Sequence, residues 1–274
     1  STLIPVRVLG GNEGTVADVI EGVNWATNLA PEERPDVINL SLGSQTENPT
    51  LGEAVAEASE AGILMVAAAG NAGDDRPFYP AAFPSVLAVG AVDCNGGRSS
   101  FSNFGDWLDL VAPGGGNSAD CGNGKAFVFS SIAEDNPNFG GAPVGGRQGT
   151  SMASPHVAGV LGLMRERNGN VEMQVIRALL REGRLTQNNT TGAFDQEIGW
   201  GIIDAEAAVT EDVSGFAALA PSLERLRLDN DRQSVDLTLE KVGNESVSFS
   251  NATVTDGEQP WLNVEPITGD RNFR

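Results

Sequence analysis

The sequence has 274 residues, 40% of them hydrophobic, which is enough to bury the core of one large domain or two smaller ones. With 37 acidic and 17 basic side chains its net charge is −20, which argues against nucleic acid and anionic membrane surfaces as partners. No apolar run reaches the roughly 18 residues that a membrane-spanning helix needs.

The first third of the chain alternates predicted strands with predicted helices. Apolar runs predict strands at 3–9, 37–42, 63–69 and 86–92, and helical spacing of apolar residues predicts helices at 15–29 and 51–61. Thr15 or Gly14 is the expected N-cap of the first helix. This alternation predicts an α/β fold with a mainly parallel sheet covered by helices on both faces.

The middle of the chain is rich in glycine, serine and asparagine from residue 93 to 149, and short β-like pieces occur at 108–111 and 126–130. A helix is predicted at 151–167, and it has almost no polar side chain between Met152 and Met164. We therefore expect this helix to be buried centrally. Another helix is predicted at 171–181.

The C-terminal part has a different pattern. Apolar residues alternate with polar ones at Leu226 and Leu228 and again from Val235 to Leu239, which predicts half-buried antiparallel strands. The sequence thus predicts two domains, an α/β domain at 1–213 and an all-β module at 214–274.

Two polar residues stand where a parallel sheet and a helix start could support catalysis. Ser151 lies in the first turn of the apolar helix, where unpaired N–H groups favour a developing negative charge, and its own N–H could donate to an oxyanion. Asn71 follows the strand at 63–69, and its amide could be a second donor. The plainer alternatives are that Ser151 caps the helix and that Asn71 only forms a turn.

The run from Gly149 to Gly159 resembles the nucleophile motif of the subtilisin-like serine proteases. Segments similar to five others of that family occur in the family's order, at 36–43, 67–71, 79–81, 99–105 and 108–114, and the resemblance covers about residues 1–212. It implies a subtilisin-like three-layer sandwich and a serine endopeptidase acting on protein or peptide substrates. In this enzyme Ser151 is the nucleophile of an acyl-enzyme mechanism and Asn71 belongs to the oxyanion hole.

The same resemblance shows a departure in the catalytic triad. The only histidine, His156, is five residues after Ser151, which turns it about 140° away on a helix, so it is not the expected base. No Asp-Thr-Gly, Asp-Ser-Gly or His-Gly-Thr-His run occurs upstream. We expect this to be the C-terminal part of a catalytic domain that lacks its Asp and His segments, is inactive alone and needs the missing N-terminal part.

The tail resembles the start of a bacterial immunoglobulin-like β-sandwich. Its roughly 58 residues fall short of the ~100 of such a domain, so we expect this module to be truncated as well.

The resemblance also implies a primary specificity pocket with two walls. One wall is Ser41, Leu42 and Gly43, whose backbone would also receive the substrate as an added strand, and the other is Ala68, Ala69 and Gly70. Small residues on both walls favour a large hydrophobic or aromatic side chain before the scissile bond. Asp74 and Asp75 could instead attract a basic one.

Cys94 and Cys121 are the only cysteines, and they are either a disulfide pair or two free thiols. The resemblance to secreted proteases favours the disulfide and an extracellular location. The chemistry implied needs no cofactor and no metal site is predicted. Structural Ca²⁺ is allowed by the resemblance, although no Asp-x-Asp-x-Asp-Gly loop occurs.

Two other function classes stay open at the level of sequence. One is a non-catalytic subtilase-like binding module, which an intact Ser151 and Asn71 disfavour. The other is an esterase of the α/β-hydrolase type, for which the chain lacks a Gly-x-Ser-x-Gly elbow and a histidine downstream of a suitable serine.

Overall fold

The computed structural model describes residues 2–10, 14–117, 121–122, 125–132, 142–187, 193–214, 216–221 and 239–243. The chain divides into two compact units, residues 1–211 and 212–274, which are described separately. The boundary expected from the sequence lies between 213 and 214.

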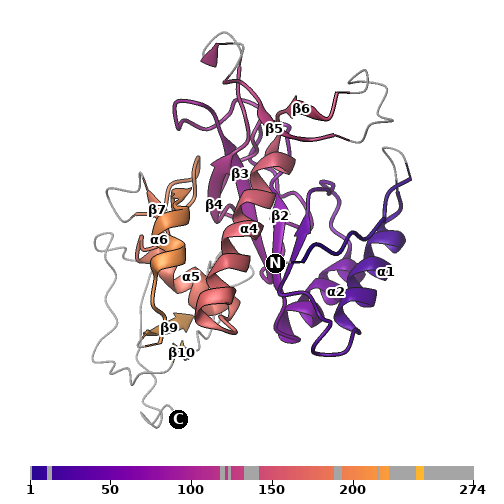
Figure 1. The fold of residues 1–274 in the computed structure, drawn as a ribbon, viewed down its shortest axis with the longest axis vertical. Helices are drawn as coiled ribbons and strands as arrows, with labels where there is room; N and C mark the ends of the chain where they lie inside the picture. Colours follow the sequence, from indigo (N-terminus) through magenta and orange to yellow (C-terminus); the bar gives the residue numbers. More distant parts are fainter. Residues whose placement is uncertain are drawn as a thin grey trace, which may run out of the picture. The chain divides into compact units, whose positions relative to one another are not determined.

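Within the described residues the first unit contains a six-stranded sheet with the order β1-β2-β3-β4-β8-β7 (Figure 1). Neighbouring strands are parallel except β7 and β8, which are antiparallel. The strands are β1 (Val37–Leu40), β2 (Leu64–Ala68), β3 (Val86–Val92), β4 (Leu110–Pro113), β7 (Thr186–Gln187) and β8 (Ile202–Ile203).

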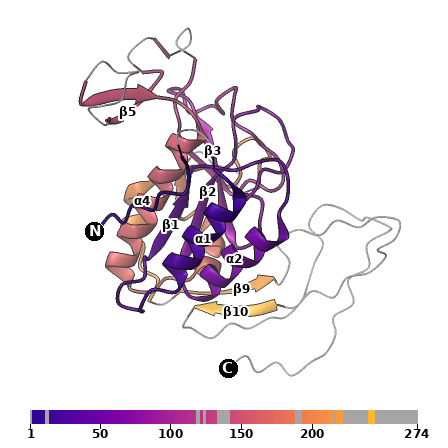
Figure 2. The same ribbon diagram turned by 90° about the vertical axis from the view of Figure 1, so that its right-hand side faces the viewer.

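Helices cover both faces of this sheet. Helix α4 (Thr150–Asn168) lies on one face, and α1 (Val16–Thr27) and α2 (Pro49–Glu60) lie on the other, as Figure 2 shows. Helix α6 (Ala205–Thr210) packs on α4, and α5 (Met173–Arg181) follows α4 in the chain. The predicted α/β fold, with a mainly parallel sheet between layers of helices, is confirmed.

Local sequence explains these elements. Every residue of β2 and β3 is buried, because apolar side chains on both faces of a strand need an apolar layer on each side. Thr15 caps α1 by accepting from the Asp18 N–H, while the Asp18 carboxylate accepts from the Thr15 N–H. Asn48 caps α2 in the same way through the Leu51 N–H, so this helix begins two residues before the predicted start.

Two expectations about burial are wrong. Residues 3–9 form no strand, because no described segment pairs with them in a ladder, and Leu3 is 92% exposed. Helix α4 is not enclosed on all sides. Its sheet-facing side is buried, but Pro155, His156 and Gly159 are exposed and the Leu163 side chain is 54% exposed.

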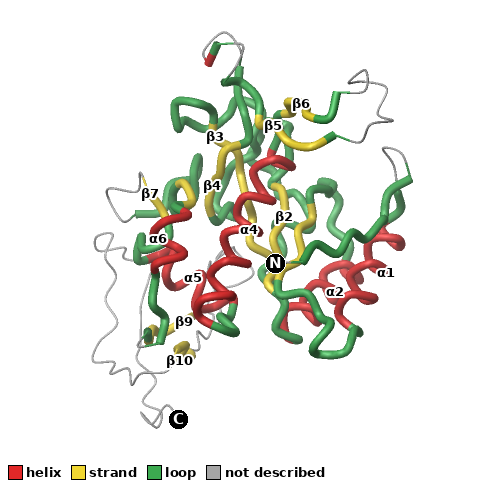
Figure 3. Tube along the Cα trace, in the orientation of Figure 1, coloured by secondary structure: helices red, strands yellow, loops and turns green. Residues whose placement is uncertain are grey.

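The described residues between β4 and α4 are largely loop, drawn green in Figure 3. It contains the antiparallel hairpin of β5 (Val128–Ser131) and β6 (Val144–Arg147). A disulfide joins Cys94, just after β3, to Cys121 in the segment between β4 and α4.

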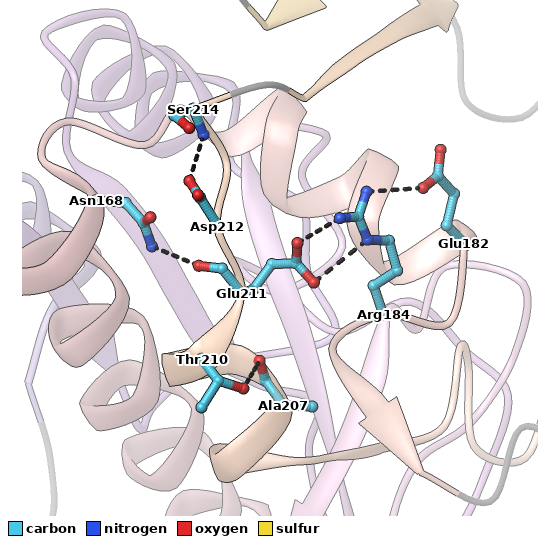
Figure 4. A network of polar contacts seen from close by, with 8 residues as sticks. All are labelled: Asn168, Glu182, Arg184, Ala207, Thr210, Glu211, Asp212 and Ser214. Atoms are coloured by element: carbon cyan, nitrogen blue, oxygen red, sulfur yellow. Dashed lines mark hydrogen bonds and ion pairs between the residues drawn. The ribbon is translucent and has the colours of Figure 1, made fainter.

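Polar contacts fasten the end of the first unit. The Arg184 guanidinium binds the carboxylates of Glu182 and Glu211, and the Asn168 side chain donates to the Glu211 carbonyl oxygen at 3.1 Å (Figure 4). The residue that follows α6 is thereby tied to the C-terminal end of α4 and to the turn after α5.

In the second unit β9 (Ala217–Pro221) pairs with β10 (Leu239–Gly243) in an antiparallel ladder. The remaining strands of the predicted immunoglobulin-like module, including Leu226, Leu228, Val235 and Leu237, lie outside the described residues. Among the helices that the structure describes, none has both the length and the apolarity needed to cross a bilayer.

Candidate active site

Asn71 caps the helix that carries Ser151. Helix α4 begins after Gly149, which has a φ of 145° and no side chain to bond the first N–H groups of the helix. The Asn71 carboxamide oxygen takes this role from the loop that follows β2, accepting from the Thr150 N–H at 2.8 Å and from the Thr150 hydroxyl at 3.1 Å.

This contact fixes the orientation of the Asn71 amide. A backbone N–H can only donate, so the atom that faces Thr150 is the carboxamide oxygen, and Nδ2 carries the two hydrogens on the other side. In the described part of the chain no group accepts a hydrogen bond from Nδ2, and the Asn71 side chain is exposed. Nδ2 lies beside Gly149, 3.5 Å from the position a Cβ would take there. A donor thus stands next to the start of the Ser151 helix.

Ser151 and Ser41 are joined by a reciprocal pair of contacts. The Ser151 hydroxyl donates to the Ser41 carbonyl oxygen at 3.3 Å, and the Ser41 hydroxyl donates to the Ser151 carbonyl oxygen at 3.0 Å. Pro155 explains the second contact, because it has no N–H to complete the helical bond to the Ser151 carbonyl. The wall predicted at Ser41 therefore also supports the helix turn that holds the candidate nucleophile.

A relay of side-chain hydrogen bonds extends this support, and sequence reasoning missed it. The Ser154 hydroxyl donates to Asn39 Oδ1 at 2.6 Å, and Asn39 Nδ2 donates to the Ser41 hydroxyl oxygen at 2.9 Å. Thr150 Oγ1 accepts from the Gly70 N–H at 3.1 Å. The ends of β1 and β2 are thus fastened to the start of α4. The available signal was Asn39, a single amide within the apolar run 37–42.

The two predicted walls follow neighbouring strands. Residues 41–43 follow β1, and Leu42 packs against the core on the α1 and α2 side of the sheet. Ala68 ends β2, and Ala69 donates to the Val89 carbonyl at 2.9 Å. Gly70 is buried and its carbonyl accepts from the Asn103 N–H at 3.0 Å. The parallel pairing of β1 with β2 brings both segments to the same edge of the sheet as Ser151.

His156 stands apart from this group. Its Nδ1 lies 2.8 Å from the Met152 carbonyl oxygen, one helical turn back, and the side chain is exposed rather than buried as expected. It faces the open side of α4, and in the described structure no hydrogen bond joins it to Ser151.

Asp74, in the acidic loop after Asn71, already accepts hydrogen bonds from other side chains of the protein. Arg76 Nε donates to Asp74 Oδ2 at 2.9 Å, and this contact lowers the pKa of Asp74. Gln45 also donates to that carboxylate, so much of the charge that could attract a basic substrate side chain is engaged. Among the described residues there is no group of three or more His, Cys, Asp or Glu side chains that could hold a metal ion.

The sequence and the fold are similar to those of known proteases. The subtilase family matches residues 1–201. The alkaline elastase YaB of Bacillus sp. (strain YaB) is 36% identical over 208 residues, which are 75% of this chain and 48% of that protein. Subtilisin Savinase of Lederbergia lenta is 36% identical over 207 residues, which are 75% of this chain and 67% of that protein.

A solved protease of Pseudoalteromonas arctica is similar in structure, with a TM-score of 0.64 and 35% identity, covering 76% of this chain and 62% of that one. A lanthipeptide protease has the same TM-score at 22% identity and supports the fold alone. The chain spans about half the length of the first curated relatives it matches. Since the family match extends over most of the first unit and includes both the Ser151 turn and Asn71, the chain belongs to the subtilase family.

Proposed function

We propose that this chain carries the nucleophile and the oxyanion donors of a serine endopeptidase that cleaves proteins or peptides. The observation that supports this most directly is the Asn71–Thr150 contact, which orients a side-chain N–H₂ group beside the turn that carries Ser151. A nucleophile flanked by a preoriented donor matches acyl transfer, in which negative charge develops on the attacked carbonyl oxygen.

The reaction follows from these positions. The Ser151 hydroxyl oxygen attacks the peptide carbonyl carbon and gives its proton to a base. The carbonyl oxygen then becomes an oxyanion that accepts from Asn71 Nδ2 and from the Ser151 N–H. Collapse breaks the C–N bond, and the leaving amine takes the proton from the base. Water then hydrolyses the ester, returning the hydrogen to Ser151.

We infer that the base and its aspartate come from polypeptide outside residues 1–274. The sequence has one histidine, and its contact with Met152 directs it away from Ser151. The exposed face of α4, with Pro155, Gly159 and Leu163, offers a surface for such a segment, and Leu3 is exposed as well. By this proposal residues 1–274 alone lack the proton acceptor. We call residues 1–274 together with that segment the completed enzyme.

We also propose an extracellular location for the protein and argue against two classes of partner. The Cys94–Cys121 disulfide supports an oxidising, extracellular location. The acidic surface, from a net charge of −20, supports neither nucleic acid nor anionic membrane as a partner. The proposed chemistry requires no cofactor, and Ca²⁺ is retained only as a structural ion.

The test compares residues 1–274 alone with the completed enzyme. We expect no casein cleavage by residues 1–274 alone, whereas the completed enzyme cleaves casein and reacts with a fluorophosphonate probe at Ser151. Ser151→Ala should abolish labelling and cleavage with an unchanged thermal midpoint. Ser100→Ala, which removes an exposed serine hydroxyl elsewhere, should change neither.

Casein cleavage by residues 1–274 alone would place the base within them. It would contradict the proposal that the base comes from polypeptide outside these residues. A folded completed enzyme that neither reacts with the probe nor cleaves casein would instead identify a binding module.

A further inference from the structure

The half-buried ring of Phe78 lies between the two predicted pocket walls. The position a Cβ would take at Gly43 is 2.6 Å from Phe78 Cε1 and 3.0 Å from Cδ1. The position a Cβ would take at Gly70 is 2.9 Å from Phe78 Cγ and 3.0 Å from Cδ2. Opposite edges of the ring therefore face opposite walls, and the ring spans the gap between them.

The ring is one of the neighbours that leave no room for a side chain at either glycine, and at Gly70 the other is Asn103 Nδ2, 2.5 Å from the position of a Cβ. A Cβ at Gly43 would also lie 2.3 Å from the Tyr79 carbonyl oxygen. Real Cβ atoms essentially never come within 3.0 Å of another atom, so both this contact and the 2.6 Å contact with the ring exclude a side chain there. The two glycines of the walls thus accommodate the protein's own aromatic side chain.

Backbone contacts hold Phe78 in this position. Ser44 and Tyr79 exchange two N–H···O bonds, of 2.7 and 2.8 Å, which fix the residue after Phe78 against the residue after Gly43. The Phe78 carbonyl accepts from the Ala82 N–H at 2.9 Å. On the other side, Asn103 bonds the Gly70 carbonyl and also accepts from the Ala72 N–H at 2.8 Å. The ring is thus attached to backbone that is anchored on both sides.

We propose that Phe78 is a specificity-determining residue that closes the primary pocket to large side chains. An enzyme with this pocket cleaves after residues with small side chains, such as alanine or glycine, and cleaves poorly after phenylalanine. The inference rests on the proposed function, since it assigns the substrate class of the same site. It replaces the preference for large residues that the small wall residues suggest.

The experiment measures kcat/KM of the completed enzyme on peptide p-nitroanilides that differ only in alanine or phenylalanine before the scissile bond. A fluorophosphonate with a small alkyl group counts reactive Ser151 in every preparation. We expect the unmodified enzyme to favour alanine, and Phe78→Ala to shift the alanine-to-phenylalanine ratio toward phenylalanine by about 10- to 200-fold. Phe78→Leu should give a smaller shift in the same direction, and it keeps the inference testable if Phe78→Ala folds poorly.

Phe104→Ala is the matched control, because this ring stacks on the Arg98 guanidinium, 4.4 Å from the ring centroid. It should leave the ratio unchanged. If Ser151 reacts with the probe but the unmodified enzyme favours phenylalanine, or if both Phe78 variants keep the original ratio, this inference is wrong and the proposed function stands. If Ser151 reacts in no preparation, the proposed function falls and the inference falls with it.

Discussion

The side-chain oxygen of Asn71 accepts a hydrogen bond from the backbone N–H of Thr150 at 2.8 Å, so one amide both caps α4 and turns its N–H₂ group outward. The two halves of this amide can be separated by mutation, because an aspartate at position 71 keeps the acceptor and loses the donor.

In the completed enzyme, Asn71→Ala and Asn71→Asp should each lower kcat by about 10²–10³ with little change in KM, because the oxyanion exists only in the transition state. Only Asn71→Ala should lower the thermal midpoint, since it alone removes the cap. Steady-state kinetics and thermal unfolding of both variants provide the check. A change confined to KM would reassign Asn71 to ground-state binding.

The Ser41 hydroxyl should matter to stability because Pro155 leaves the Ser151 carbonyl without its helical donor. Ser41→Ala should destabilise the protein by about 1 kcal/mol. When Pro155→Ala is also present, the new N–H can serve that carbonyl, and the same substitution should cost less. Denaturant unfolding of the two single variants and the double variant measures this coupling. Strictly additive effects would mean that the hydroxyl does not compensate for the proline.

The single tyrosine of the chain, Tyr79, should ionise at unusually high pH. Burial, and then the carboxylate of Glu47, which accepts from the Tyr79 hydroxyl at 3.3 Å, raise the pKa of Tyr79 above its ordinary value of 10.0. The folded state therefore favours the protonated phenol. That contribution is complete below the unfolded pKa and is lost as pH rises through the folded pKa.

Tyrosinate absorbance titrates this one group directly in the native protein. Glu47→Gln should move its midpoint back toward the ordinary value by removing the smaller cause, while burial keeps part of the shift. A native midpoint equal to that of the unfolded chain would contradict the expected burial.

Arg177 and Asp109 form an ion pair within the interior, 3.1 Å apart, with side chains 10% and 5% exposed. Asp109 also accepts from the Ala88 N–H at 2.8 Å, and Arg177 donates to the Val86 carbonyl at 2.8 Å. Arg177→Met or Asp109→Leu alone should cost about 3–5 kcal/mol, because each leaves a buried charge without its partner.

The double variant should cost less than the sum of the two single changes, as denaturant unfolding can show. Arg76→Ala, which breaks an exposed pair with Asp74, should cost less than about 1 kcal/mol. Single changes at Arg177 and Asp109 as mild as this control would show that water reaches the pair.

Short-range sequence signals predicted the parts of the fold that depend on local chemistry. Strand β3 occupies 86–92 as predicted because its apolar run needs burial on both faces, and Thr15 caps α1 because its hydroxyl is within reach of the Asp18 N–H. The strand expected at 3–9 failed because a strand is stabilised by a neighbour, which the apolar pattern of one segment does not provide.

The candidate site also has a part that could be predicted from the sequence and a part that could not. The motif around Ser151 and the position of Asn71 after a buried strand could be recognised from residue types. The role of Asn39 and the placement of Phe78 depend on contacts between segments that are far apart in sequence, such as Asn39 with Ser154 and Phe78 with Gly43. The path of the loop that carries Phe78 between the walls is a property of tertiary packing, and residue preference does not encode it.

The relay that holds the start of α4 consists of hydroxyls and amides from Asn39, Ser41, Asn71, Thr150 and Ser154, and none of these side chains carries a formal charge. Dissolved ions screen interactions between exposed charges, over about 10 Å at 0.1 M, and act weakly on hydrogen bonds between groups that carry no charge. High salt should therefore loosen pairs such as Arg76–Asp74 and relieve the repulsion of a strongly acidic surface, while the geometry around Ser151 stays constant.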